Sequence, residues 1–118
     1  MLSLMVPWLN VEYIGPLFYQ TDTCQVRRIY DGDTMTLNCH GRKVKTRLYC
    51  IDAPEMNQHP WGRQARDALR KITPKTVVLR TVDTDQYGRS VGEVLVPGSG
   101  ESLNLHLVKQ GQAEVYWQ

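Results

Sequence analysis

The chain has 118 residues, of which 42% are hydrophobic, and its formal net charge is +2. This length supplies one small domain and excludes a second, because a chain of this size lies near the lower limit at which a single hydrophobic core is stable. No apolar run approaches the roughly 20 residues that a membrane-spanning helix needs, so we expect no membrane partner.

The basic residues are unevenly placed along the chain. None precedes Arg27, and twelve of the fourteen lie between Arg27 and Arg80. This clustering suits a phosphate-rich ligand, although a solvated basic face would have the same composition. Residues 1–23 are expected to be an N-terminal extension, and residues 24–118 a single domain. The first residues lack the cationic start and cleavage site of a secretory signal, so the compartment stays open.

The first elements in chain order are predicted strands. β-rich stretches at residues 24–31 and 34–39 flank Asp31-Gly32-Asp33, which is typical of a turn. Apolar and polar residues then alternate from 42 to 51, which predicts a third strand. Its apolar face carries Val44, Thr46, Leu48 and Cys50. Its other face carries Lys43, Lys45 and Arg47, so Arg47 should point away from the core.

The period changes after Pro54. Apolar residues at 61, 65, 68, 69 and 72 predict a helix, with Pro60 in its first turn and Thr73-Pro74 ending it. Two further strands are expected at 77–82 and 89–96. A second helix should run from about Ser102, its N-cap, to Gln110, with Gly111 ending it. This order indicates a mainly β fold with α (α+β): a five-stranded OB-fold-like barrel with about two flanking helices.

Three cysteines, Cys24, Cys39 and Cys50, are too few for a zinc site or a disulfide scaffold. We interpret them first as small buried hydrophobic side chains. The alternative is a bridge between Cys24 and Cys39, which could approach each other if the first two strands pair as a hairpin. Such a bridge would need an oxidising compartment.

Four short motifs carry the candidate chemistry: Asp31-Gly32-Asp33-Thr34, Arg47, Ile51-Asp52-Ala53-Pro54-Glu55 and Tyr87-Gly88-Arg89. An EF-hand loop starting at Asp31 is excluded, because its sixth and twelfth positions hold Thr36 and Arg42 instead of Gly and Glu. The order and spacing of the motifs resemble the staphylococcal nuclease (thermonuclease) family over roughly residues 24–116. The resemblance implies an OB-like barrel and calcium-dependent hydrolysis of DNA and RNA. The substrate would be single-stranded or locally opened, with little sequence specificity and 3′-phosphate products.

Two carboxylates, Asp33 and Asp52, are the oxygen donors that a hard cation such as Ca²⁺ prefers. The resemblance adds the backbone carbonyl of Ala53. The alternative for both aspartates is that they accept hydrogen bonds from turn amides. Asp31 is expected to be a turn residue or to lie just behind the metal ligands.

The resemblance makes Glu55 the general base for an attacking water. Arg47 and Arg89 can stabilise the negative charge that builds on phosphorus, and they occupy the matching positions of the family. Tyr87 is expected either to contact a terminal phosphate or base, or simply to pack. Surface roles are the alternatives for Glu55 and both arginines.

A rival interpretation is a non-catalytic nucleic-acid or protein-binding barrel. A two-metal phosphatase is disfavoured, because His40, His59 and His106 show no ligand spacing.

The chain also departs from the family pattern. Gln86 stands where the best-known member has a lysine, the loop after Glu55 is short, and the chain stops where a further helix is expected. Apolar surface could then stay open, be covered by residues 1–20, or reflect truncation or self-association. A monomer is the default expectation, and protein partners are unknown.

Overall fold

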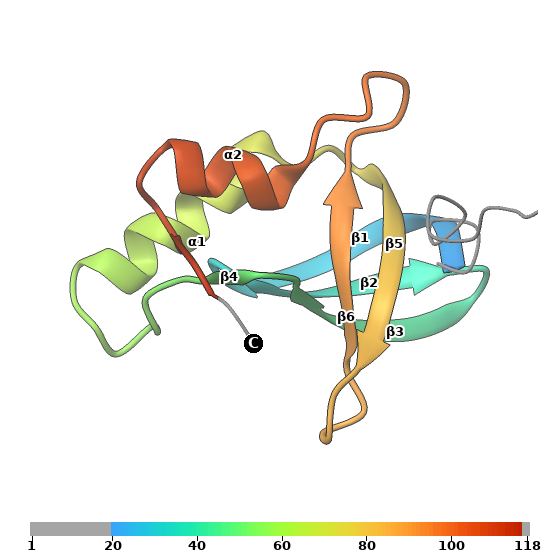
Figure 1. The fold of residues 1–118 in the computed structure, drawn as a ribbon, viewed down its shortest axis with the longest axis horizontal. Helices are drawn as coiled ribbons and strands as arrows, with labels where there is room; N and C mark the ends of the chain where they lie inside the picture. The colour runs from blue at the N-terminus through green and yellow to red at the C-terminus, as the bar shows by residue number, and fades with distance from the viewer. Residues whose placement is uncertain (1–19, 117–118) are drawn as a thin grey trace, which may run out of the picture.

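The computed structural model describes residues 20–116, which form a closed five-stranded barrel with two helices beside it (Figure 1). The elements in chain order are β1 (Gln20–Asp31), β2 (Thr34–Cys39), β3 (Arg42–Leu48), β4 (Ile51–Asp52), α1 (Trp61–Ile72), β5 (Thr76–Thr84), β6 (Ser90–Leu95), α2 (Leu103–Lys109) and β7 (Glu114–Val115). The order around the barrel is β1-β2-β3-β6-β5, and β4 and β7 form a separate two-stranded sheet. The OB-fold-like α+β prediction is confirmed.

Barrel closure depends on one parallel pairing. β1 pairs antiparallel with both β2 and β5, and β5 pairs antiparallel with β6. β3 and β6 run parallel, from Thr46 opposite Ser90 to Leu48 opposite Gly92. Because the barrel is closed, none of these five strands is left as an open edge.

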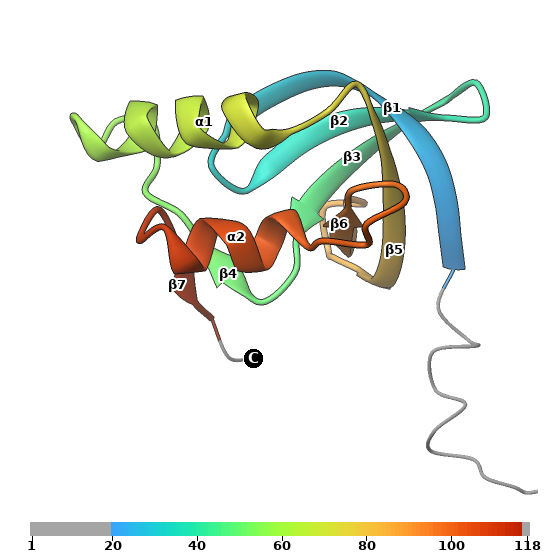
Figure 2. The same cartoon turned by 90° about the horizontal axis from the view of Figure 1, so that it is seen from above.

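The core lies inside the barrel and beneath the helices. Period-two alternation buries Met35 and Leu37 of β2 and Leu48 of β3, while Lys43 and Lys45 of β3 are exposed. The expected two faces of the third strand are therefore confirmed. Both helices lie on the same side of the barrel (Figure 2), and their buried residues include Ala65, Leu69, Leu103 and Leu107.

The turn between β1 and β2 fits against α1 only because it contains Gly32. A Cβ at this position would lie 2.7 Å from the Cβ atoms of both Ala53 and Ala65. Such a contact is too short for any side chain, so glycine lets the turn sit directly beneath the helix. The candidate site is built on this turn.

Several element boundaries differ from the prediction. β1 starts at Gln20 instead of residue 24, because residues 20–23 pair with β5. β3 ends at Leu48 instead of continuing to residue 51, since Cys50 has a φ of 63° that breaks the strand. Pro60 is the N-cap of α1 and precedes its first turn. The proposed covering role of residues 1–20 falls almost wholly outside the described residues.

The second helix follows its predicted signals closely. The Ser102 side chain accepts a hydrogen bond from the Leu105 N–H at 3.2 Å, as an N-cap should. Gly111 follows the helix with a φ of 73°. Between residues 20 and 116, no helix has the length and apolar character to cross a membrane.

Cys24 and Cys39 form a disulfide, with Cα atoms 4.4 Å apart, and Cys50 is free. Our first interpretation of Cys24 and Cys39, as unbridged buried side chains, was therefore wrong. Pairing of Gln25 with Asn38 sets a register in which Cys24 and Cys39 are also opposite each other. Both side chains are buried in the core, so the bridge joins β1 to β2 on the inner face.

Candidate active site

The turn between β1 and β2 holds a buried carboxylate. Asp31 Oδ1 accepts a hydrogen bond from the Asp33 N–H at 3.1 Å, which confirms Asp31 as a turn residue. Asp33 Oδ2 accepts from the Ala53 N–H at 2.8 Å, and Asp33 Oδ1 accepts from the Thr34 hydroxyl at 3.1 Å. Asp33 thereby ties the turn to the chain that leaves β4.

Burial raises the pKa of Asp33 to about 6, although the Ala53 N–H and the charge of Arg47 act to lower it. The negative charge of nearby Asp31 raises the pKa further. Removal from water therefore outweighs the favourable contacts. A cation placed beside Asp33 would favour its ionised form.

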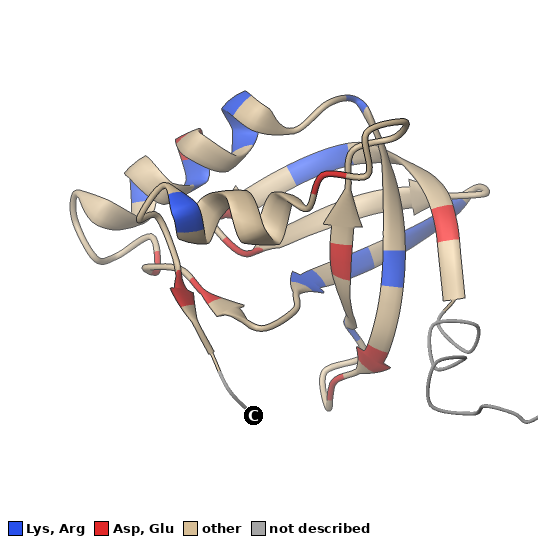
Figure 3. Cartoon of the chain, turned by 45° about the horizontal axis from the view of Figure 1, so that its top comes forward, with Lys and Arg blue, Asp and Glu red and all other residues tan. Residues whose placement is uncertain are grey.

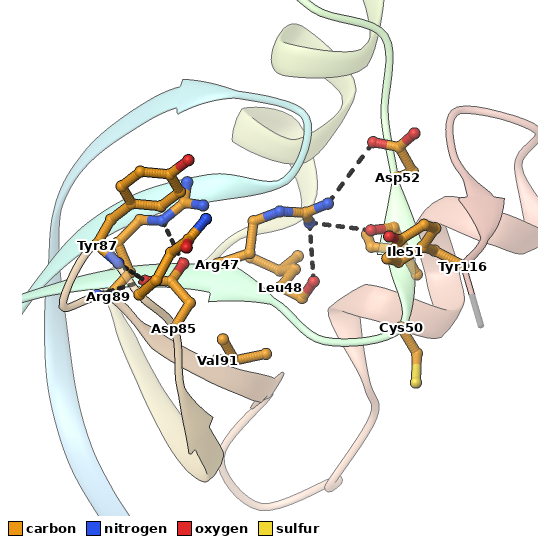
Figure 4. Close-up of a pocket in the computed structure, with 11 residues that line it drawn as sticks. Arg47, Leu48, Cys50, Ile51, Asp52, Asp85, Tyr87, Arg89, Val91 and Tyr116 are labelled. Carbon is orange, nitrogen blue, oxygen red and sulfur yellow. Dashed lines mark hydrogen bonds and ion pairs between the residues drawn. The ribbon is translucent and has the colours of Figure 1, made fainter. Parts of the chain in front are cut away.

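Arg47 connects the two aspartates. Its Nη1 donates to the carbonyls of Leu48 at 3.0 Å and Ile51 at 2.9 Å, and lies 3.4 Å from Asp33 Oδ2. Its Nη2 lies 3.6 Å from Asp52 Oδ1 (Figure 4). The guanidinium is thus fixed between a buried carboxylate and an exposed one.

The loop between β5 and β6 supplies the opposite wall of the site. Arg89 Nε donates to Asp85 Oδ2 at 2.7 Å, while Asp85 Oδ1 accepts from the backbone N–H groups of Tyr87 and Arg89. Burial alone would raise the pKa of Asp85, but these hydrogen bonds and the charge of Arg89 hold it below its usual value. The Arg89 guanidinium also lies 5.6 Å from the centre of the Tyr87 ring. Asp85 therefore fixes Arg89 in place.

A pocket of about 430 Å³ lies between these two walls. Its lining residues are Arg47, Leu48, Cys50, Ile51, Asp52, Asp85, Gln86, Tyr87, Arg89, Val91 and Tyr116 (Figure 4). Tyr87 is 75% exposed, so its ring is not part of the core. The structure brings both predicted arginines, Asp52 and Tyr87 to one cavity. Asp33 does not line this cavity, but its carboxylate lies beside the Arg47 guanidinium.

Glu55 is exposed on the loop between β4 and α1, and it is not among the residues that line this pocket. Its backbone is nonetheless well held. The Glu55 N–H donates to Gln58 Oε1 at 2.7 Å, and the Glu55 carbonyl accepts from the Gln58 N–H at 2.9 Å. A Cβ at Gly62 would lie 2.0 Å from the Glu55 carbonyl oxygen, so only glycine allows this close approach.

The donors near Asp33 fit a hard cation only in part. Asp33 and Asp52 offer carboxylate oxygens, and burial raises the pKa of Asp33 despite the Ala53 N–H and Arg47 beside it. Within residues 20–116, however, no three His, Cys, Asp or Glu side chains are grouped closely enough to hold a metal. A cation here would need backbone carbonyl and water oxygens as well, which Ca²⁺ readily accepts.

Three residues of the site were missed by sequence reasoning. Asp85 fixes Arg89, and Gln58 fixes the Glu55 loop. Glu114 of β7 is paired with Asp52 of β4, and the two residues line a small neighbouring cavity together with Ala53. Of these three residues, only Asp85 could have been found from the sequence, because an Asp four residues before Arg89 can bridge a turn to it. The pairing of two-residue strands leaves no recognisable sequence pattern.

The fold and site together define a small OB-type barrel with a polar pocket at one end, where acidic and guanidinium groups meet. A family model described as "Staphylococcal nuclease homologue" matches residues 45–118, and the chain belongs to this family.

Curated relatives agree with this placement. An "Uncharacterized endonuclease" of Escherichia coli O157:H7 is 38% identical over 95 residues, which cover 80% of this chain and 61% of the relative. An "Uncharacterized endonuclease" of Haemophilus influenzae is 38% identical, covering 84% and 55%. A "Micrococcal nuclease" of Shigella flexneri is 35% identical, covering 78% and 57%. The chain thus spans little more than half the length of these relatives.

Proposed function

We propose that this chain is a calcium-dependent nuclease that hydrolyses phosphodiester bonds of DNA and RNA with little sequence specificity. The observation that carries the proposal is the position of Arg47, held between Asp33 and Asp52 and facing the pocket that Arg89 also lines. Membership of the staphylococcal nuclease homologue family and the endonuclease names of relatives support the same activity.

The two arginines bind the scissile phosphate. They come from opposite walls of the pocket, and each is fixed by partners on its own wall. A planar guanidinium donates two parallel hydrogen bonds to phosphate oxygens, and this charge stabilises the five-coordinate transition state. Tyr87, exposed at the pocket rim, contacts a base or terminal phosphate.

Asp33, Asp52 and the Ala53 carbonyl would hold the Ca²⁺ ion. When bound, the ion supplies positive charge beside the phosphate and favours deprotonation of a nearby water. The raised pKa of Asp33 supports this assignment, because a cation would relieve the unfavourable burial of its charge.

Glu55 is the general base. Its exposed carboxylate either takes a proton from the attacking water or orders that water, as the water oxygen bonds to phosphorus. The bond from phosphorus to the 5′-oxygen then breaks; this oxygen takes a proton from solvent and leaves as a 5′-hydroxyl, while the other product keeps a 3′-phosphate. Because these groups contact phosphate and not base edges, sequence preference should be weak.

The decisive experiment compares wild type with Glu55→Gln on labelled single-stranded DNA and RNA, with calcium or with excess chelator. We expect calcium-dependent cleavage by wild type and a rate about 10²–10⁴-fold lower for the variant. Glu101→Gln, at an exposed position before α2, is the matched control and should cleave like wild type. Analysis of product ends by mass spectrometry tests the predicted 3′-phosphate.

Binding of strands without cleavage by well-folded wild type would contradict the proposal. It would favour the non-catalytic binding barrel instead.

A further inference from the structure

A second cavity lies on the outer surface of β1, β2 and β3. Its volume is about 360 Å³, and its lining residues are Arg27, Arg28, Tyr30, Thr36, Leu37, Asn38, Gly41 and Lys43. It shares none of these with the pocket that holds Arg47 and Arg89. We call the surface formed by Arg27, Arg28, Tyr30, Lys43 and Lys45 the basic groove. The four cations of the groove are all exposed.

Strand pairing brings these cations together from distant parts of the chain. Arg28 of β1 is opposite Thr36 of β2, which in turn is opposite Lys45 of β3. A register shift between Val26 and Arg28 interrupts the alternation of β1. As a result Arg27 and Arg28, although adjacent in sequence, both line the cavity.

Tyr30 organises the groove. Its hydroxyl forms a 2.8 Å hydrogen bond with the Thr36 hydroxyl, which is buried beneath it. The Arg28 guanidinium lies 5.0 Å and the Lys45 ammonium 5.8 Å from the centre of the ring. Contacts of this kind hold two cations at defined positions over one aromatic ring.

The pKa of the Tyr30 phenol reflects this setting. The hydrogen bond with Thr36 is the largest cause of its lowered pKa, desolvation opposes that shift, and the charges of Lys45, Arg28 and Lys43 lower it further. Two like charges repel when they are held near each other, so such a cluster is a ready site for an anion.

The groove and the proposed cleavage site lie along the same face of one strand, β3. Lys43, Lys45 and Arg47 follow one another at alternate positions of β3 and therefore share its outer face. Basic segments recur along this strand in Figure 3. At about 3.3 Å per residue, the distance from Arg47 to Lys43 is about 13 Å, which several phosphates of one strand would span.

We propose that the basic groove binds the phosphate backbone of the same single strand that enters the Arg47 pocket, at nucleotides beyond the scissile bond. The inference extends the proposed nuclease function and rests on it for the identity of the strand. Charge complementarity selects a polyanion, and the position of the groove on the same strand face as Arg47 selects a nucleic-acid strand from among polyanions. Long strands should therefore bind and react better than short ones.

The test uses the triple variant Arg28→Gln/Lys43→Gln/Lys45→Gln of the full chain. The matched control is Arg63→Gln/Lys71→Gln/Lys109→Gln, which removes three exposed charges from α1 and α2 instead. Circular dichroism melting confirms that each variant is folded. The double variant Lys43→Gln/Lys45→Gln changes only exposed side chains of β3 and gives a second measurement if the triple variant does not fold.

Binding of a fluorescent 20-nucleotide single strand is measured by anisotropy at several salt concentrations, in chelator so that no cleavage occurs. The slope of log affinity against log salt should fall in magnitude by about 2 in the triple variant and by about 1.4 in the double variant, since each phosphate contact contributes about 0.7. The control should keep the wild-type slope. Equal slopes for the triple variant and wild type would overturn the inference.

Cleavage separates this inference from the proposed function. With calcium, the triple variant should lose kcat/KM on the 20-nucleotide strand but keep the wild-type value on a dinucleotide, which is too short to reach the groove. Equal losses on both substrates would overturn the inference and leave the nuclease assignment intact. Groove-dependent binding by a wild type that cleaves neither substrate would overturn the nuclease assignment and support the groove as a binding site. A polyglutamate peptide that competes as well as the strand would overturn the selection of nucleic acid.

Discussion

The two ends of the β1–β2 hairpin differ in what holds them. At the open end, Cys24 and Cys39 are buried and joined by a disulfide. At the turn, buried Asp33 is held by hydrogen bonds and by the nearby Arg47, and burial raises its pKa. One end therefore contributes stability, while the other keeps an unfavourable buried charge that a ligand could compensate.

This difference indicates how a barrel of about a hundred residues can carry a polar site. A small core leaves little free energy to offset a buried carboxylate. A covalent link on the same two strands restricts the unfolded chain and supplies part of that free energy. The turn can then hold a buried carboxylate without unfolding the hairpin. The following changes test whether stability and activity depend on different ends of the hairpin.

The largest effect is expected from Arg47→Lys at the turn end. Lysine cannot reproduce the planar fork that contacts the Leu48 and Ile51 carbonyls and faces the pocket. We expect kcat/KM to fall by about 10²–10³-fold, while urea denaturation shows a stability loss of only about 1–2 kcal/mol. Arg63→Lys, exposed on α1, is the control for an arginine outside the site. Unchanged activity would remove Arg47 from the proposed phosphate clamp.

Opening the disulfide should have the opposite profile. The bridge joins residues 15 positions apart, and a loop of this size is worth about 3 kcal/mol of stability. Cys24→Ala/Cys39→Ala should lower the free energy of unfolding by about that amount, with kcat unchanged at a temperature where the variant is folded. Urea denaturation measures the first quantity, and Cys50→Ala controls for loss of a free thiol. An unchanged urea midpoint would mean that the bridge does not stabilise the hairpin.

Asp33 gives the turn a pH dependence that the disulfide end lacks. Its pKa is about 6 in the folded chain against a usual 3.8, so between these values the folded state binds more protons than the unfolded state. In chelator, this group should therefore lower stability as pH rises from about 4 to about 6, by roughly 2–3 kcal/mol, with no further change above that range.

Urea denaturation across this pH range measures the effect, and Asp33→Asn should abolish it. Asp83→Asn, at an exposed position of β5, should leave it in place. An identical pH profile for Asp33→Asn and wild type would show that the Asp33 carboxyl is not the source.

Sequence patterns predicted one end of the hairpin better than the other. The Asp31-Gly32-Asp33 turn and the outward face of Arg47 followed from turn chemistry and period-two alternation, and the structure has both. Pairing of Cys24 with Cys39 stayed an alternative, because the strand register that brings them together is set by tertiary pairing.

The site shows the same limit. Local patterns located the segments that carry Asp52 and Arg89, but not the contacts that fix them. Asp52 and its neighbour Ile51 are paired with β7, a two-residue strand that is too short to show a sequence period. Gly62 is needed because the Glu55 carbonyl oxygen lies where a Cβ would be. This is a tertiary contact, and no sequence pattern predicts it.

The smallest effect is expected at Tyr87, on the loop that faces the turn end across the pocket. The ring is exposed and lies near the Arg89 guanidinium, so it can be removed without disturbing the core. Stacking on a base is worth about 1–3 kcal/mol, so Tyr87→Ala should raise KM for single strands by about fivefold or more with little change in stability. Tyr87→Phe keeps the ring and should change KM by less than about twofold if stacking is the contact. Should Tyr87→Phe impair binding as much as Tyr87→Ala, the hydroxyl would be the group that contacts the substrate, and a terminal phosphate would be its partner.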